Sequence, residues 1–168
     1  MEVLDSYLLS VAVLATLGSG LVAGLLFAFS TAVMKALVRL PPDQGMKAMQ
    51  HINVVILNPL FLGIFLGTAL LSAMLALSAL LRWPAPGSIW MLAGAGCYLI
   101  GTFGVTIAVN VPLNNRLAST DAAASGSPSL WSAYVERWLR WNHLRTFLGA
   151  MATIAFTLAA THLRSPGP

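Results

Sequence analysis

Charged residues are scarce in this sequence. Of 168 residues, nine are Lys or Arg and five are Asp or Glu, which is 8% of the chain. Soluble domains carry about 25%. Hydrophobic residues make up 58%, and the mean hydropathy is +0.81. Because so few charges cannot cover a water-facing surface, the composition excludes a soluble globular enzyme, a disordered tail and a nucleic-acid-binding module.

Cysteine is nearly absent as well. The single Cys97 lies inside an apolar run, and one cysteine cannot form a disulfide within the chain. The formal net charge is +4, but the basic residues lie between apolar runs. We therefore take the charge as a signal of membrane topology and expect the lipid bilayer, not a nucleic acid, as the partner.

Long charge-free runs are what the chain has in abundance. Four of them stand out, at residues 6–34, 48–81, 83–115 and 146–163. A helix needs about 20 apolar residues to cross a bilayer, and helices satisfy their own backbone there. We predict an all-α fold in one integral membrane domain, residues 1–168, with transmembrane helices at about 6–34, 53–81, 89–110 and 144–163.

The basic residues are distributed unevenly among the predicted loops. Seven of the nine lie in or beside the first and third loops, whereas only Arg82 and Arg164 lie elsewhere. The positive-inside rule then places those loops in the cytoplasm and both termini outside, and we expect the cell (inner) membrane. Glu2 and Asp5 precede the first apolar run, where a signal peptide would be basic, so we expect that segment to remain as a helix.

The third loop contains a further helical pattern. Ser127-Pro128 is typical of a helix start. The run from Trp131 to His143 has the pattern of an amphipathic helix, in which Trp131, Tyr134, Trp138 and Trp141 form one aromatic stripe. We expect this additional interfacial helix to lie on the membrane before the fourth transmembrane helix, with the stripe in contact with lipid.

Polar residues gather at one membrane level, the cytoplasmic ends of the second, third and fourth predicted helices. Polar groups cost free energy in a bilayer and usually face the bundle interior or mark a site. We therefore predict a polar pocket between these three helices. The residues concerned are His51, Asn53, Asn58, Asn110, Asn114, Asn115, Arg116, Asn142, His143 and Arg145.

Local backbone features refine this prediction. If the second helix is continuous, His51 and Asn58 share one of its faces. Pro59 predicts a kink, and Pro112 predicts the end of the third helix near Asn110. The pairs Gly20/Gly24 and Gly63/Gly67 have the four-residue spacing of helix contacts, either within the chain or in a homo-oligomer.

Three chemistries are compatible with these residue types. His51, His143 and Glu136 are a two-histidine, one-carboxylate set for a metal, although no local ligand spacing supports it. The two histidines are also candidate axial ligands of a haem. The third chemistry is general base catalysis, in which a histidine takes a proton and Asn and Arg donors hold the resulting oxyanion.

Three stretches carry a resemblance to a known family. They are Met49-Gln50-His51-Ile52-Asn53, then Asn110-Val111-Pro112-Leu113-Asn114-Asn115, and then Trp138 followed by Trp141-Asn142-His143-Leu144-Arg145. Together they resemble the DUF1772, or anthrone oxygenase-like, membrane proteins over nearly the whole chain.

The resemblance implies an oxidoreductase, specifically a monooxygenase, that oxidises a hydrophobic aromatic substrate with molecular oxygen. His143 or His51 would remove a proton, and Asn110, Asn142 and Arg145 would stabilise the oxyanion. The substrate would contact Trp138, Trp141 and three asparagines, Asn53, Asn58 and Asn114. No cofactor is predicted, although a metal or haem stays open. The alternative is a non-catalytic protein that binds or transports a small lipophilic molecule.

Overall fold

The computed structural model describes residues 2–164, and nearly all of these are helical. The elements follow one another as α1 (Glu2–Ala28), η1 (Phe29–Val33), α2 (Met34–Val38), α3 (Pro42–Val55), α4 (Pro59–Leu81), α5 (Ser88–Gly96), η2 (Cys97–Gly104), η3 (Thr106–Asn110), α6 (Val111–Ala118) and α7 (Ser127–Arg164), where η marks π-helical turns. The predicted all-α bundle is confirmed. The four helices long and apolar enough to cross a membrane are Val3–Val38, Pro59–Leu81, Ser88–Ala118 and Ser127–Leu163, so the chain is an integral membrane protein.

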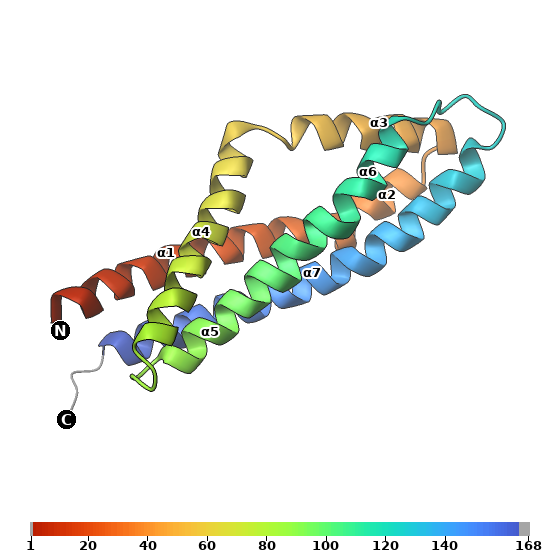
Figure 1. Ribbon diagram of the computed structural model, residues 1–168. Helices are drawn as coiled ribbons and strands as arrows, with labels where there is room; N and C mark the ends of the chain where they lie inside the picture. Colours follow the sequence, from red (N-terminus) through yellow and green to blue (C-terminus); the bar gives the residue numbers. More distant parts are fainter. Residues whose placement is uncertain (1, 165–168) are drawn as a thin grey trace.

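The helices run lengthwise beside one another (Figure 1). The start of α1, the turn between α4 and α5 and the end of α7 lie at one end of the bundle, where Arg82 forms an ion pair with Asp5. The elements α2, α3 and α6 and the start of α7 lie at the other end, which we call the basic end because it carries Lys35, Arg39, Lys47, Arg116 and Arg137. Both ends of the chain's helical part are thus on one side, and which side of the membrane this is stays a prediction.

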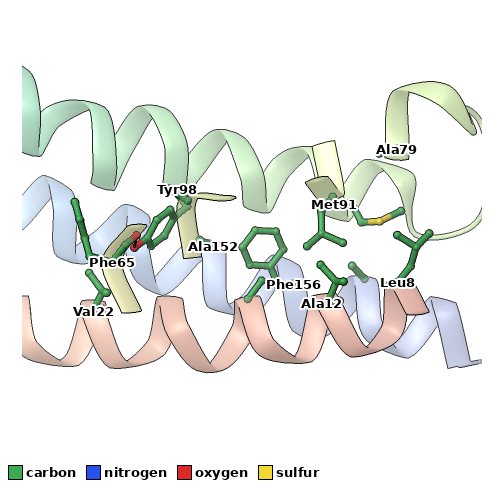
Figure 2. Close-up of a cluster of buried hydrophobic side chains, with 14 of the residues drawn as sticks. Leu8, Ala12, Val22, Phe65, Ala79, Met91, Tyr98, Ala152 and Phe156 are labelled. Atoms are coloured by element: carbon green, nitrogen blue, oxygen red, sulfur yellow. Dashed lines mark hydrogen bonds between the residues drawn. The ribbon is translucent and has the colours of Figure 1, made fainter. Parts of the chain in front are cut away.

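The membrane-spanning part has a core of apolar side chains between α1, α4, α5 and α7. Figure 2 shows Phe156 of α7 between Met91 of α5 and Ala12 of α1, with Tyr98 and Phe65 further along. The Tyr98 hydroxyl donates to the Phe65 carbonyl at 3.1 Å, which satisfies this buried polar group. Many of the core residues are alanines, and their small side chains allow the helix backbones to approach one another closely.

Glycines also allow close helix contacts, and of the four predicted glycines Gly20 packs against another helix, since a Cβ there would lie 3.7 Å from Thr153 of α7. A Cβ on Gly94 would lie 2.6 Å from the Phe156 ring, and one on Gly101 would lie 2.3 Å from Leu148. By contrast, no atom lies within 4 Å of a Cβ built on Gly24, Gly63 or Gly67. The four-residue spacing therefore did not identify the closest contacts within the chain, and a role of these pairs in a homo-oligomer stays a prediction.

The basic end has its own core, which corrects the prediction for the tryptophan stripe. Trp131, Tyr134 and Trp138 are each only 4% exposed. They pack in a second cluster whose other buried members are Met34, Leu37, Met46, Met49, Leu117 and Ala122. The expected contact of Trp131 and Trp138 with lipid is wrong, because α2 and α3 cover this face. Moreover α7 runs unbroken from Ser127 to Arg164, so a separate interfacial helix is not confirmed.

The second predicted helix is in fact two helices joined by a sharp bend, visible in Figure 1 between α3 and α4. The α3 helix ends at Val55, and Asn58 caps α4 by accepting from the Phe61 N–H at 3.0 Å. Pro59 then stands at the first helical position, where its missing N–H costs nothing. The prediction that His51 and Asn58 share one continuous face is therefore wrong.

The third helix, in contrast, does not end at Pro112. It continues from Ser88 to Ala118 through the π-helical segments η2 and η3, and Pro112 falls in the first turn of α6. A proline ring clashes with the preceding helical turn and removes an N–H. The wider π turns before it change the hydrogen-bond pattern, as π-bulges do near functional sites. The expected helix end at Asn110 is wrong, and Asn110 instead lies buried inside a long helix.

The contact between α5 and α7 is testable by adding one methyl group. Gly94→Ala should lower the free energy of unfolding by about 1–3 kcal/mol, because Cβ would press on the buried Phe156 ring. The matched control is Gly63→Ala, where no atom lies within 4 Å and helix propensity predicts no loss or a gain of up to about 1 kcal/mol. Thermal unfolding in detergent measures both. Equal stability of the two variants would contradict this packing.

Candidate functional site

A cavity of about 470 Å³ lies beside the bend between α3 and α4. Its other walls come from the end of α1, η1, η3, α6 and α7. Its volume is in the range of small-molecule sites. The end of α1 and η1 supply Leu25, Leu26 and Phe29, while α4 supplies Phe61. The polar lining residues are Gln50, Asn53, Thr106, Asn110, Asn114, Asn115 and Arg145.

Most of the cavity wall is apolar and aromatic. The rings of Phe29 and Trp138 are tilted against each other with centroids 5.7 Å apart. Val54 and Leu57 also line the cavity, yet they are 72% and 61% exposed. The cavity therefore reaches an apolar outer surface beside the bend, and a lipophilic molecule suits its walls.

Of the residues that the structure describes, Arg145 is the only charged one that lines the cavity, and it is 5% exposed. Its Nη1 donates to the Thr106 hydroxyl at 3.0 Å, and its Nη2 donates to Asn142 Oδ1 at 2.7 Å. The guanidinium carbon lies 5.4 Å from the centroid of the Trp138 ring, a cation–π contact. Among residues 2–164 no carboxylate pairs with it, since the ion pairs there are Arg82–Asp5 and Arg140–Glu136. A buried cation without a counter-ion favours an anionic ligand.

Asn142 fixes the position of Arg145. It lies one helical turn earlier on α7 and is fully buried. Its Nδ2 donates to the Leu26 carbonyl at 2.8 Å and to the Ser30 hydroxyl at 2.7 Å. These acceptors lie where α1 passes into the π turn η1. Asn142 thus ties α7 to α1 and leaves its oxygen to orient the guanidinium.

Unpaired polar atoms converge on the same cavity. In the part of the chain that the structure describes, five buried side-chain nitrogen or oxygen atoms have no hydrogen-bond partner. Four belong to cavity residues, namely Asn53 Nδ2, Asn110 Nδ2, Asn110 Oδ1 and Arg145 Nε. Leaving such groups unpaired costs about 1–3 kcal/mol each. Three of these four atoms are hydrogen-bond donors, so an oxygen atom that accepts hydrogen bonds would complement the cavity.

Two other amides are already engaged within the protein. Asn114 Oδ1 accepts from the Tyr134 hydroxyl at 2.9 Å and from Trp138 Nε1 at 3.1 Å. Gln50 Nε2 donates to the carbonyls of Leu117 and Thr120 at the end of α6. These bonds hold the cavity wall together.

The family resemblance assigned ten residues to proton transfer, oxyanion stabilisation or substrate contact. The structure brings six of these ten together. Asn53, Asn110, Asn114, Trp138 and Arg145 line the cavity, and Asn142 lies directly behind Arg145.

The other four lie elsewhere. His51 is exposed and lines a separate shallow cavity of about 280 Å³ with Asn58, which serves as the cap of α4. His143 is exposed on the neighbouring face of α7, and half-buried Trp141 does not line the main cavity. The two histidines therefore do not share the cavity with the asparagines.

The expected metal ligands do not assemble either. In residues 2–164 no three His, Cys, Asp or Glu side chains lie close enough to hold a metal ion. His51, His143 and Glu136 therefore do not form the three-ligand set that the sequence left open.

Sequence reasoning missed several residues of the site. Thr106 and Ser30 accept from Arg145 and Asn142, and Phe29 and Phe61 form the wall. Hydroxyl and phenyl side chains are common throughout these apolar helices, so no local pattern distinguished them. Only the π turns and the bend at Asn58-Pro59 bring them to the cavity.

Comparison with known proteins finds one family. The sequence model described as anthrone oxygenase matches residues 60–155, which include Asn110, Asn142 and Arg145. No curated protein and no solved structure matches the chain.

The hydrogen bonds from Asn142 to Leu26 and Ser30 predict a large loss of stability when the Asn142 side chain is removed. Asn142→Ala should lower the free energy of unfolding by about 2–4 kcal/mol, because two donor bonds are lost and Arg145 loses an acceptor. Asn115→Ala, at an exposed asparagine of the same cavity, should change it by less than about 0.5 kcal/mol. Chemical or thermal unfolding in detergent compares them, and similar stabilities would refute this role for Asn142.

Proposed function

The chain belongs to the anthrone oxygenase (DUF1772) family, and from this premise we propose that it is an oxygen-dependent membrane oxidoreductase. Its substrate is a hydrophobic, flat aromatic molecule whose reacting methylene is conjugated to a carbonyl, as in an anthrone. The substrate occupies the cavity beside the bend between α3 and α4, with its rings against Trp138 and Phe61. Molecular oxygen is the co-substrate.

One observation carries this proposal, the set of unpaired donors around Arg145. Asn53 Nδ2, Asn110 Nδ2 and Arg145 Nε are buried without partners, and each belongs to the cavity lining. When a methylene that is conjugated to a carbonyl through aromatic rings loses a proton, the negative charge is delocalised onto the carbonyl oxygen. Fixed donors in a site of low dielectric stabilise such an oxyanion strongly, and this is often the largest contribution to catalysis. The donor set therefore lowers the free energy of the anion relative to the neutral substrate.

The anion then reacts with oxygen. Its carbon donates electrons to O₂, a C–O bond forms, and the peroxide takes up a proton. The hydroperoxide loses water together with the second hydrogen of the carbon, which leaves a ketone. The sum is R₂CH₂ + O₂ → R₂CO + H₂O. O₂ accepts all four electrons, so the reaction needs no separate reductant.

The first proton needs an acceptor, and among residues 2–164 no histidine, carboxylate or lysine lines the cavity. We assign this role to water that reaches the cavity past Gln50 and Asn115. Catalysis then rests on stabilising the anion, with Arg145 as the principal donor. The histidine base implied by the resemblance is the competing hypothesis.

Removing the donors should reduce turnover. Arg145→Gln and Asn110→Leu should each lower the rate of oxygen uptake above the spontaneous background by about 10²–10³-fold, the usual effect of losing an oxyanion donor. The assay is oxygen consumption and quinone formation by detergent-purified protein given an anthrone. Arg140→Gln is the matched control, because Arg140 is an exposed arginine on the same helix that pairs with Glu136.

Two outcomes would overturn the proposal. Full activity of Arg145→Gln would remove the oxyanion role. Loss of activity in His143→Ala or His51→Ala, with intact folding, would restore the histidine base, whereas our account expects these variants to stay within about twofold of the unmodified protein. If no uptake occurs but the intrinsic tryptophan fluorescence of the protein reports saturable anthrone binding, a binding or transport protein becomes the better description.

A further inference from the structure

A second hollow lies at the basic end, between α6 and the first turns of α7. It encloses about 420 Å³, and its lining includes Leu113, Arg116, Leu117, Leu130, Tyr134 and Arg137. We call it the arginine groove. The cavity beside the α3–α4 bend lies behind it, since Tyr134 lines the groove while its hydroxyl bonds to Asn114, which lines that cavity.

We propose that the arginine groove binds an anionic phospholipid of the surrounding bilayer, with the phosphate between Arg116 and Arg137. Both arginines line the groove and both are exposed. Neither forms an ion pair with a carboxylate among residues 2–164, because Glu136, the acidic neighbour of Arg137 on α7, pairs with Arg140. Two guanidinium groups that face one hollow without a counter-ion match a phosphate, which accepts forked hydrogen bonds.

The first turn of α7 adds to this field. Gly126, Ser129 and Leu130 form the far end of the groove, at the start of a 38-residue helix. The N-terminal end of a helix carries a partial positive charge. It supports the arginines but would not make a site without them.

The depth of the groove points to a lipid and not to a freely soluble ligand. Arg116 lies six residues beyond Asn110, and Arg137 lies seven residues before Leu144. At 1.5 Å per residue each is about 10 Å from the apolar part of its helix. Lipid headgroups occupy this level, and basic pockets between transmembrane helices are where they bind.

The surface below the groove suits acyl chains. Trp141 and Leu144 follow Arg137 at four and seven residues, so they continue its face of α7 toward the membrane. Leu144 is exposed and Trp141 is half-buried. An indole at this level is typical of the membrane–water interface. The face therefore runs from cationic to interfacial to apolar, which is the order of groups along a phospholipid.

Lipid retention tests the proposal. The full-length protein, delipidated in detergent, is incubated with equal amounts of phosphatidylglycerol and phosphatidylcholine, and retained lipid is counted by native mass spectrometry. We expect phosphatidylglycerol to be preferred by about tenfold or more, and the double variant Arg116→Gln/Arg137→Gln to lose that preference. The control is Arg39→Gln/Lys47→Gln, which removes the same charge from exposed basic residues outside the groove, leaves the Arg140–Glu136 pair intact and should keep the preference.

The remaining outcomes overturn the proposal. Equal retention of phosphatidylglycerol by the double variant and the unmodified protein would show that the arginines hold no lipid. An equal loss in the control pair would show attraction to net charge alone. Complete displacement of phosphatidylglycerol by inorganic phosphate, with no effect of chain length, would make the groove a site for a free anion. A thermal unfolding scan of each variant confirms that folding is retained.

Discussion

The arrangement of the cavity depends on how the buried guanidinium of Arg145 is held. No carboxylate among residues 2–164 pairs with it. Arg145 is bonded to Thr106 and Asn142 and stacked on Trp138, and its Nε stays unpaired. Removing a charge from water is costly, so a buried guanidinium persists only where its neighbours orient it and satisfy most of its hydrogen bonds. Each of these neighbours is in turn held by another helix. Asn142 is anchored on α1, and Trp138 donates to Asn114 on α6.

The irregular backbone segments place the residues that hold Arg145 and line the cavity. The π turn η1 contains Ser30, and Leu26 lies in the last turn of α1 just before it, so both acceptors of Asn142 lie at this junction. The π turn η3 carries Thr106 and Asn110 into the cavity. The bend at Asn58-Pro59 draws α3 away from the line of α4 (Figure 1). Leu57 and Phe61, on either side of the bend, both line the cavity. Non-helical backbone at membrane depth is tolerated where it borders a cavity. The unpaired donors and the irregular backbone thus lie in one region of the molecule.

Much of the fold could be predicted, because charge-free runs and bilayer thickness leave few alternatives. The site was harder to predict, and the adjacent pair Asn142 and His143 shows why. Both occur at the predicted membrane level, but neighbouring residues of a helix point about 100° apart. One is buried against α1 and the other is exposed. The tryptophan stripe failed for a related reason: periodicity shows that a face is apolar, but not whether lipid or α3 covers it. The helix end predicted from Pro112 was wrong because no sequence pattern indicated the π turns that accommodate this proline.

The central claim is that the cavity stabilises an oxyanion, and an indicator ligand tests it most directly. A hydroxyanthraquinone such as 1,2-dihydroxyanthraquinone changes colour when its phenol ionises, and it resembles the proposed product. Absorbance is followed against pH with the ligand bound to the unmodified protein and to Arg145→Gln. Our account predicts that the bound phenolate forms at least about one pH unit lower in the unmodified protein than in the variant, since one unit corresponds to about 1.4 kcal/mol. The same transition in both proteins, or a shift to higher pH on binding, would contradict it.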